Sequence, residues 1–253
     1  MGLKIDVFPC LSDNYGFILV DEATGATACV DTPDADAISR RLQDLGLPYL
    51  HYILNTHWHP DHAGGNAVLK ERHGATIWGP EEVRQTGPLD HVMEEDWSVL
   101  LGETQLDVIE LPGHTLGHIG YHDRTGGNAF VGDTLFTLGC GRLFEGTPQQ
   151  MWQSLSKIIE LPDDTRVYSA HEYTLGNLAF AESLGALPAL EARASRIRAM
   201  RERGEPTVPT TIGEERETNP FLVYPLREQG FEAQAAKFGE LRAAKDDFKA
   251  PAP

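Results

Sequence analysis

The most chemically informative stretch of the chain is Thr56-His57-Trp58-His59-Pro60-Asp61-His62, which gathers three imidazoles and one carboxylate. Imidazole nitrogens and carboxylate oxygens are ligands that zinc, iron and manganese take from proteins. A single histidine in such a stretch is more often structural, but a cluster this dense reverses that expectation. We therefore predict a metal site here, and a dinuclear one.

The residues around this cluster predict the elements that must position it. Residues 52–56 are typical of a buried strand, and Gly64-Gly65 loosen the backbone before a helix begins. Other ligand-type residues also follow predicted strands: His114 after residues 105–111, Asp133 after residues 128–132, and His171 after residues 166–170. Strand ends along one edge of a layered sheet can bring such side chains together, so we treat all three as candidate ligands.

Residues 56–62 match the THxHxDH motif of the metallo-β-lactamase superfamily, and His114, Asp133 and His171 match the ligands that follow it there. The chain thus resembles that superfamily, which implies an α/β fold, the αββα sandwich. The resemblance implies one metal held by His57, His59 and His114, and a second held by Asp61, His62 and His171. Asp133 would bridge the two, and Asp61 and Asp133 would be the catalytic carboxylates. The implied cofactor is a pair of divalent ions, zinc before iron or manganese.

Four later blocks are more specific than this motif: residues 138–147, 171–178, 211–215 and 219–221. They are similar to the signature blocks of the hydroxyacylglutathione hydrolase (glyoxalase II) family. The resemblance implies hydrolysis of S-D-lactoylglutathione and related glutathione thioesters to glutathione and a 2-hydroxy acid, in methylglyoxal detoxification. It also implies a smaller helical C-terminal domain that completes the glutathione site. We expect residues 1–174 to form the catalytic domain and residues 175–253 the glutathione-binding domain.

Helices are expected over most of the C-terminal part. Thr147-Pro148-Gln149-Gln150 is a helix start with a capping box, and residues 189–203 and 238–248 have helical composition. Arg242, Lys245 and Lys249 share one face of the last helix. Spacing alone favours a solvated face for this basic stripe, but in the family an Arg and a Lys at the positions of Arg242 and Lys245 bind the glycine end of glutathione.

The resemblance assigns further substrate contacts to Tyr173, Arg142 and Phe144. Some family members have a Lys where this chain has Arg142, and a Tyr where it has Phe144. Arg142 keeps the positive charge, but Phe144 cannot donate a phenolic hydrogen bond. We therefore expect weaker or otherwise compensated substrate affinity. Cys140 lies in the same block and is expected to pack rather than to act as a nucleophile.

The composition agrees with this interpretation. The net charge of −17 repels phosphate backbones, which argues against a nucleic acid partner. The three cysteines form no disulfide framework, and no apolar run reaches the roughly 18 residues of a membrane span. We expect a monomeric cytoplasmic enzyme that acts on a small molecule and not at a membrane.

Two other functions remain open. A glutathione persulfide dioxygenase with a single iron is the closest chemical competitor, although residues 211–221 and the helical tail favour the hydrolase. A non-enzymatic metal-binding protein is disfavoured because the ligand set is complete.

Overall fold

The computed structural model describes residues 2–185, 187 and 189–249. By internal contacts the chain divides into two compact units. Unit 1 comprises Met1–Glu110 and Gly117–Gly132, and unit 2 comprises Leu111–Leu116 and Asp133–Pro253.

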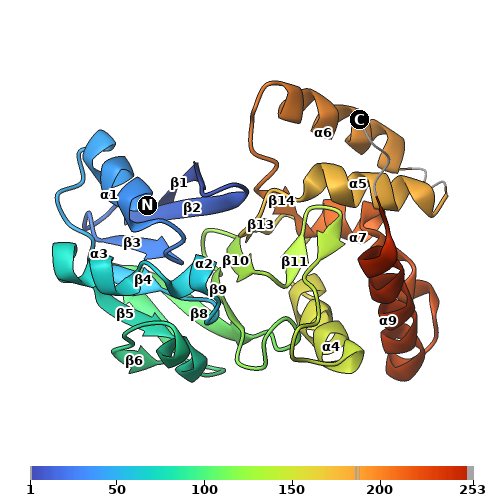
Figure 1. Ribbon diagram of the computed structural model, residues 1–253, viewed down its shortest axis with the longest axis horizontal. Coiled ribbons are helices and arrows are strands. Elements are labelled where there is room, and N and C mark those ends of the chain that lie inside the picture. The colour runs from blue at the N-terminus through green and yellow to red at the C-terminus, as the bar shows by residue number, and fades with distance from the viewer. Residues whose placement is uncertain (1, 186, 188, 250–253) are drawn as a thin grey trace. The chain divides into compact units, whose positions relative to one another are not determined.

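Unit 1 begins with a six-stranded sheet in the order β1-β2-β3-β4-β5-β6 (Figure 1). β1 to β3 pair antiparallel, whereas β3 to β6 pair parallel. Parallel neighbours need crossover connections, which are helical here between β3 and β5. The strands are β1 (Leu3–Cys10), β2 (Asn14–Asp21), β3 (Thr27–Val30), β4 (Tyr52–Leu54), β5 (Thr76–Gly79) and β6 (His91–Val92), and the crossover helices are α1 (Ala35–Asp44), α2 (Pro60–Ala63) and α3 (Asn66–His73), with the 3-10 helix η1 (Glu81–Gln85) before β6.

A second group of strands in unit 1 is antiparallel throughout: β7 (Ser98–Leu101), β8 (Thr104–Glu110), β9 (Ile119–Asp123) and β10 (Asn128–Gly132). It faces the first sheet. Phe17 of β2 meets Phe130 of β10 with ring centroids 5.8 Å apart, and the Tyr121 hydroxyl of β9 donates to the Asn55 carbonyl at 2.8 Å. Side chains alternate along a strand, so the neighbouring Ile18 points to the other face of the first sheet. There it shares a core with Ile38 of α1 and other apolar residues of α1 and α3.

Unit 2 is mainly helical. Its helices are α4 (Pro148–Ile159), α5 (Thr174–Ser183), α6 (Leu190–Glu202), α7 (Ile212–Thr218), α8 (Pro220–Val223), the 3-10 helix η2 (Pro225–Arg227) and α9 (Phe231–Asp247), and its strands are β11 (Leu135–Phe136), β12 (Gly139–Cys140), β13 (Arg166–Ser169) and β14 (Thr210–Thr211). The predicted capping box of α4 is confirmed, because Thr147 and Gln150 bond each other's backbone N–H groups. α4 packs against α9 (Figure 1), where Trp152 Nε1 donates to Gln234 Oε1 at 3.2 Å.

A buried ion pair fixes the hairpin of β11 and β12. Arg193 of α6 pairs with Glu215 of α7, and their side chains are 5% and 0% exposed. Glu215 Oε2 also accepts the Leu138 N–H and the Asn219 Nδ2–H, both at 2.9 Å. The two blocks at residues 211–215 and 219–221 therefore have a structural role in unit 2, since they hold the hairpin turn in place.

The last helix differs from the prediction at both ends. α9 begins at Phe231 rather than 238, because its first two turns carry mostly exposed residues that give no apolar period. It ends at Asp247, so Lys249 lies beyond the helix and the predicted three-residue stripe is wrong at that position. None of the helices in the described part of the chain has the length and apolar character needed to span a membrane.

Candidate metal centre and substrate cavity

The loop between β4 and α2 holds the histidine cluster. His57 and His62 are buried, and Pro60 begins α2 so that the chain turns sharply after His59. His57 Nε2 lies 3.0 Å from His59 Nδ1, and His62 Nε2 lies 3.4 Å from the Asp61 carboxylate. The prediction that this segment brings ligand-type side chains close together is confirmed for these two pairs.

Asp31, at the end of β3, orients two of these imidazoles. Its carboxylate accepts the His62 Nδ1–H, the Thr56 hydroxyl and the Thr56 N–H, each at 2.8 Å. The Thr56 hydroxyl in turn lies 3.0 Å from His57 Nδ1. With both Nδ1 atoms engaged in this way, His57 and His62 have Nε2 available for a metal.

Asp31 and Asn14 were not among the predicted site residues. Asn14 Nδ2 donates to Asp61 Oδ2 at 3.1 Å. Both lie more than twenty residues from their partners in sequence. A signal was available for Asp31, because it follows an apolar strand as the candidate ligands do.

His114, Asp133 and His171 form a second compact set in unit 2. Asp133 Oδ2 lies 3.3 Å from His114 Nε2 and 3.5 Å from His171 Nε2, so one carboxylate oxygen stands near two imidazole nitrogens. His114 Nδ1 donates to the Arg142 carbonyl at 2.9 Å, which again leaves Nε2 for a metal. All three side chains are buried.

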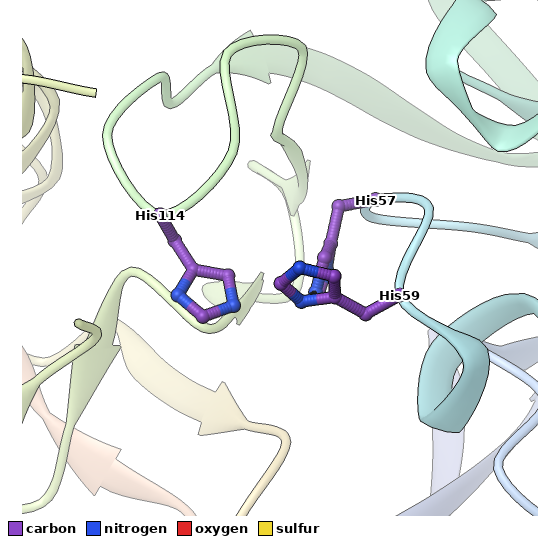
Figure 2. Close-up of side chains that lie close together, drawn as sticks. All are labelled: His57, His59 and His114. Atoms are coloured by element: carbon purple, nitrogen blue, oxygen red, sulfur yellow. Dashed lines mark hydrogen bonds between the residues drawn. The ribbon is translucent and has the colours of Figure 1, made fainter. Parts of the chain in front are cut away.

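Ligand atoms come within 4.8 Å of one another in three sets: His57, His59 and His114; His57, His62 and Asp133; Asp61, His62 and His171. Figure 2 shows the first set, with the imidazoles of His57, His59 and His114 close together.

The separations between neighbouring candidate ligand atoms fit a metal. Two ligand atoms at about 2.0–2.1 Å from a tetrahedral ion stand about 3.3 Å apart. The pairs described above are 3.0, 3.3, 3.4 and 3.5 Å apart. The donors are imidazoles and carboxylates without thiolate, which suits zinc, iron and manganese alike. A divalent metal site of histidine and aspartate is therefore the chemistry that these residues support.

A cavity of about 640 Å³ in unit 2 joins candidate ligands to candidate substrate contacts. Its walls include His114 and Asp133 together with all five residues predicted to bind substrate: Arg142, Phe144, Tyr173, Arg242 and Lys245. The Tyr173 ring stacks on His171 with centroids 4.7 Å apart, and the Phe144 ring lies edge-on to His114 at 5.2 Å. The volume lies within the usual range of about 300–1,000 Å³ for small-molecule sites.

Arg142, Arg242 and Lys245 form what we call the cation cluster. Arg242 is only 5% exposed, so the solvated-face interpretation of the basic stripe is wrong for it. Its guanidinium donates to the Cys140 carbonyl and to Asp246 Oδ1, both at 2.9 Å. Lys245 Nζ donates to the Gly176 carbonyl at 2.7 Å. Burial, and then the charges of Arg242 and Arg142, lower the pKa of Lys245 to about 8.

Two residues near the site have supporting roles. Burial raises the pKa of Cys140 to about 11, so its thiol stays protonated at neutral pH and is a poor nucleophile. This agrees with the packing role expected for it. The His118 ring stacks on His57 with centroids 4.8 Å apart, which supports that ligand from the side.

Two facing sheets whose loops carry histidines and aspartates of this kind are typical of metal-dependent enzymes of the metallo-β-lactamase class. The family model of the "Metallo-beta-lactamase superfamily" matches residues 19–171 of this chain. The model of the "Hydroxyacylglutathione hydrolase C-terminus" matches residues 172–248. The chain is 48% identical to the hydroxyacylglutathione hydrolase of Erythrobacter litoralis (strain HTCC2594), over 97% of this chain and 100% of that protein. The chain belongs to the hydroxyacylglutathione hydrolase family of the metallo-β-lactamase superfamily.

Solved structures agree on the fold. ETHE1 from Myxococcus xanthus aligns with a TM-score of 0.71 and 25% identity, over 99% of this chain and 93% of that one. TTHA1623 in a di-iron-bound form aligns with a TM-score of 0.62 and 24% identity, over 87% and 100%. The predicted α/β fold with a helical C-terminal part is confirmed. The boundary at residues 174 and 175 stays a prediction.

Proposed function

We propose that this protein hydrolyses S-D-lactoylglutathione and related glutathione thioesters to glutathione and a 2-hydroxy acid, and so acts in methylglyoxal detoxification. The observation that carries the proposal is the cavity of unit 2, whose walls hold both His114 and Asp133 and the cation cluster. A thioester whose carbonyl lies at the candidate ligands and whose peptide carboxylate lies at the cations would fill both ends. The full-length similarity to proteins named hydroxyacylglutathione hydrolase supports the same activity.

We assign His57, His59 and His114 to one metal and Asp61, His62 and His171 to a second, with Asp133 as the shared ligand. The position of Asp133 Oδ2 near one histidine of each set supports the bridging role. Zinc is our first choice for both ions, with iron or manganese also suited to these donors; the di-iron structure of a relative supports a metal pair. When bound, such a pair would supply hydroxide near neutral pH and a Lewis acid for the thioester carbonyl.

The protein's own residues then have defined tasks. Asp61 would hold one metal and orient the water, and Asn14 holds its carboxylate by the hydrogen bond to Oδ2. Asp31 keeps His57 and His62 in the tautomer and orientation that binding requires. No strong general acid is needed, because a thiol with a pKa of about 8–9 leaves readily as the thiolate.

The other end of the cavity recognises glutathione. In this proposal Arg242 and Lys245 bind its glycyl carboxylate, with Arg142, Tyr173 and Phe144 as further contacts. Phe144 is 61% exposed and offers only its ring, so it can contribute apolar contact but no hydrogen bond. A monomeric state and a cytoplasmic location complete the proposal, and sedimentation of the purified protein would test the first.

A glutathione persulfide dioxygenase would use a single iron and consume oxygen. The match of residues 172–248 to the hydroxyacylglutathione hydrolase C-terminus favours the thioester hydrolase over that alternative.

The test combines metal analysis with turnover under anaerobic conditions. We expect close to two metal ions per metal-replete chain, and equimolar thiol and D-lactate from S-D-lactoylglutathione with oxygen excluded. The Asp133→Ala variant should lose both metals and activity, whereas His171→Ala should chiefly lose one metal. Turnover that stops without oxygen, or a fully active enzyme with one metal, would contradict the proposal.

A further inference from the structure

Asp246 stands directly beside the cation cluster. Among the described residues that line the cavity it is one of three with a carboxylate, and the other two are Asp133 and Glu172. Its Oδ1 accepts a hydrogen bond from Arg242 NH2 at 2.9 Å and lies 3.6 Å from Arg142 Nε. The side chain of Asp246 is 43% exposed, whereas that of Arg242 is 6% exposed. A carboxylate of the chain itself therefore sits where two arginines converge on the cavity.

The hydrogen bonds of Arg242 leave few alternatives for a ligand. NH1 is directed to the Cys140 carbonyl, and Nε, which is buried, has no hydrogen-bond partner in the described part of the chain. The NH2 group carries the contact to Asp246. Because Arg242 is nearly covered, a ligand carboxylate that reaches this guanidinium from the cavity must share the NH2 edge with Asp246 or displace it from that edge.

We infer that Asp246 occupies the anion position of the cation cluster and competes there with the glycyl carboxylate of the glutathione thioester, so that it lowers the affinity for substrate and product alike. This inference rests on the proposed function. Asp246 thus weakens binding at the cation cluster, whose other residues attract the ligand, because its carboxylate neutralises one of the three positive charges.

The competition has a use in catalysis. The reaction changes only the thioester, so contacts to the peptide part of glutathione bind substrate and product equally and cannot accelerate the chemical step. If these contacts were very strong, the thiol product would leave slowly. An internal carboxylate limits this uniform binding and also disfavours small anions that make only one contact, because such anions do not compensate for the lost pair with Asp246.

The experiment compares Asp246→Asn with wild type in the full-length, metal-loaded enzyme. The amide keeps an acceptor oxygen for Arg242 but removes the negative charge. We would titrate S-methylglutathione, which cannot be hydrolysed, and its glycyl ethyl ester, in which the carboxylate is blocked. A partly exposed ion pair contributes about 0.2–1 kcal/mol, so Asp246→Asn should bind S-methylglutathione about 1.5- to 5-fold more tightly. The KM for thioester and the inhibition constant for glutathione should fall by the same factor, and the blocked ester should bind as it does to wild type.

Asp247→Asn is the matched control, since it removes the same charge from the next residue of α9, which is exposed and does not line the cavity. It should bind both ligands as wild type does. Thermal melting checks that Asp246→Asn is folded, and Asp246→Ser serves if it is not. Unchanged or weaker binding of S-methylglutathione by a folded variant, or equal tightening for the blocked ester, overturns the inference. A wild-type enzyme that neither binds S-methylglutathione nor hydrolyses the thioester instead refutes the proposed function.

Discussion

The orienting role of Asp31 leads to a prediction for the Asp31→Asn variant. The carboxylate accepts three hydrogen bonds in a buried site, two from Thr56 and one from His62 Nδ1. An amide has one acceptor oxygen and one donor nitrogen, so it cannot satisfy all three groups. If its oxygen faces His62, the buried Thr56 N–H loses its acceptor. If its nitrogen faces His62, the histidine must place its proton on Nε2, where a metal should bind.

The expected losses of stability and of metal affinity can be given approximate sizes. A buried group left without a partner costs about 1–3 kcal/mol, and each kcal/mol lowers the melting temperature by about 2–4 °C in a protein of this size. We therefore expect metal-free Asp31→Asn to melt roughly 2–12 °C below wild type. Loss of the partner that orients a metal-binding histidine typically costs 10- to 100-fold in metal affinity, which we expect here in competition with a chelator.

Asp21→Asn is the control for this variant. Asp21 is likewise buried in unit 1 and accepts hydrogen bonds from Thr24 and Thr104, but it contacts no candidate ligand. It should lose stability and keep the wild-type affinity for metal. If Asp31→Asn melts early yet binds metal within threefold of wild type, orientation of His62 by Asp31 does not govern metal binding.

Two other predictions concern unit 2. Because burial and then the charges of Arg242 and Arg142 lower the pKa of Lys245 to about 8, the KM for the thioester should rise as the pH passes from 7 to 9 and the cation is lost. Lys245→Arg should remove that rise. A flat wild-type profile would exclude Lys245 as the group that binds the carboxylate. Glu215→Gln leaves the buried Arg193 without its charge partner, which should cost about 3–5 kcal/mol in unfolding free energy, whereas Glu214→Gln breaks a partly exposed pair and should cost under about 1 kcal/mol. Equal melting temperatures of the two variants would contradict the structural role given to the Arg193–Glu215 pair.

The histidine cluster could be predicted because its information is local. Residues 56–62 carry the ligand types, and the strand that positions them comes directly before. The structure places His57 Nε2 3.0 Å from His59 Nδ1. Asp31 could not be assigned in the same way. Its contacts are to residues 25 and 31 positions later, and only the parallel pairing of β3 with β4 brings the ends of these strands together.

The basic stripe shows another limit of sequence patterns. Spacing placed Arg242 and Lys245 on one face of a helix, and that is correct, but spacing does not reveal what covers a face. Arg242 is buried because Cys140, more than a hundred residues earlier in the chain, supplies the carbonyl that its guanidinium needs. Similarly, the family resemblance singled out residues 211–215, but no periodicity indicated that Glu215 would be fully buried beside Arg193.

The cavity of unit 2 also bears on how such an enzyme can diverge. Its cations come from Arg142, after β12, and from Arg242 and Lys245 on α9, whereas the histidine cluster at residues 56–62 belongs to a different stretch of the chain. On the proposed assignment of Arg242 and Lys245 to glutathione, substitutions in α9 would alter which thiol carrier is recognised without touching a candidate metal ligand. Selection could therefore change the carrier while the hydrolytic residues stay constant, and α9 is the segment in which descendants with new substrates should differ first.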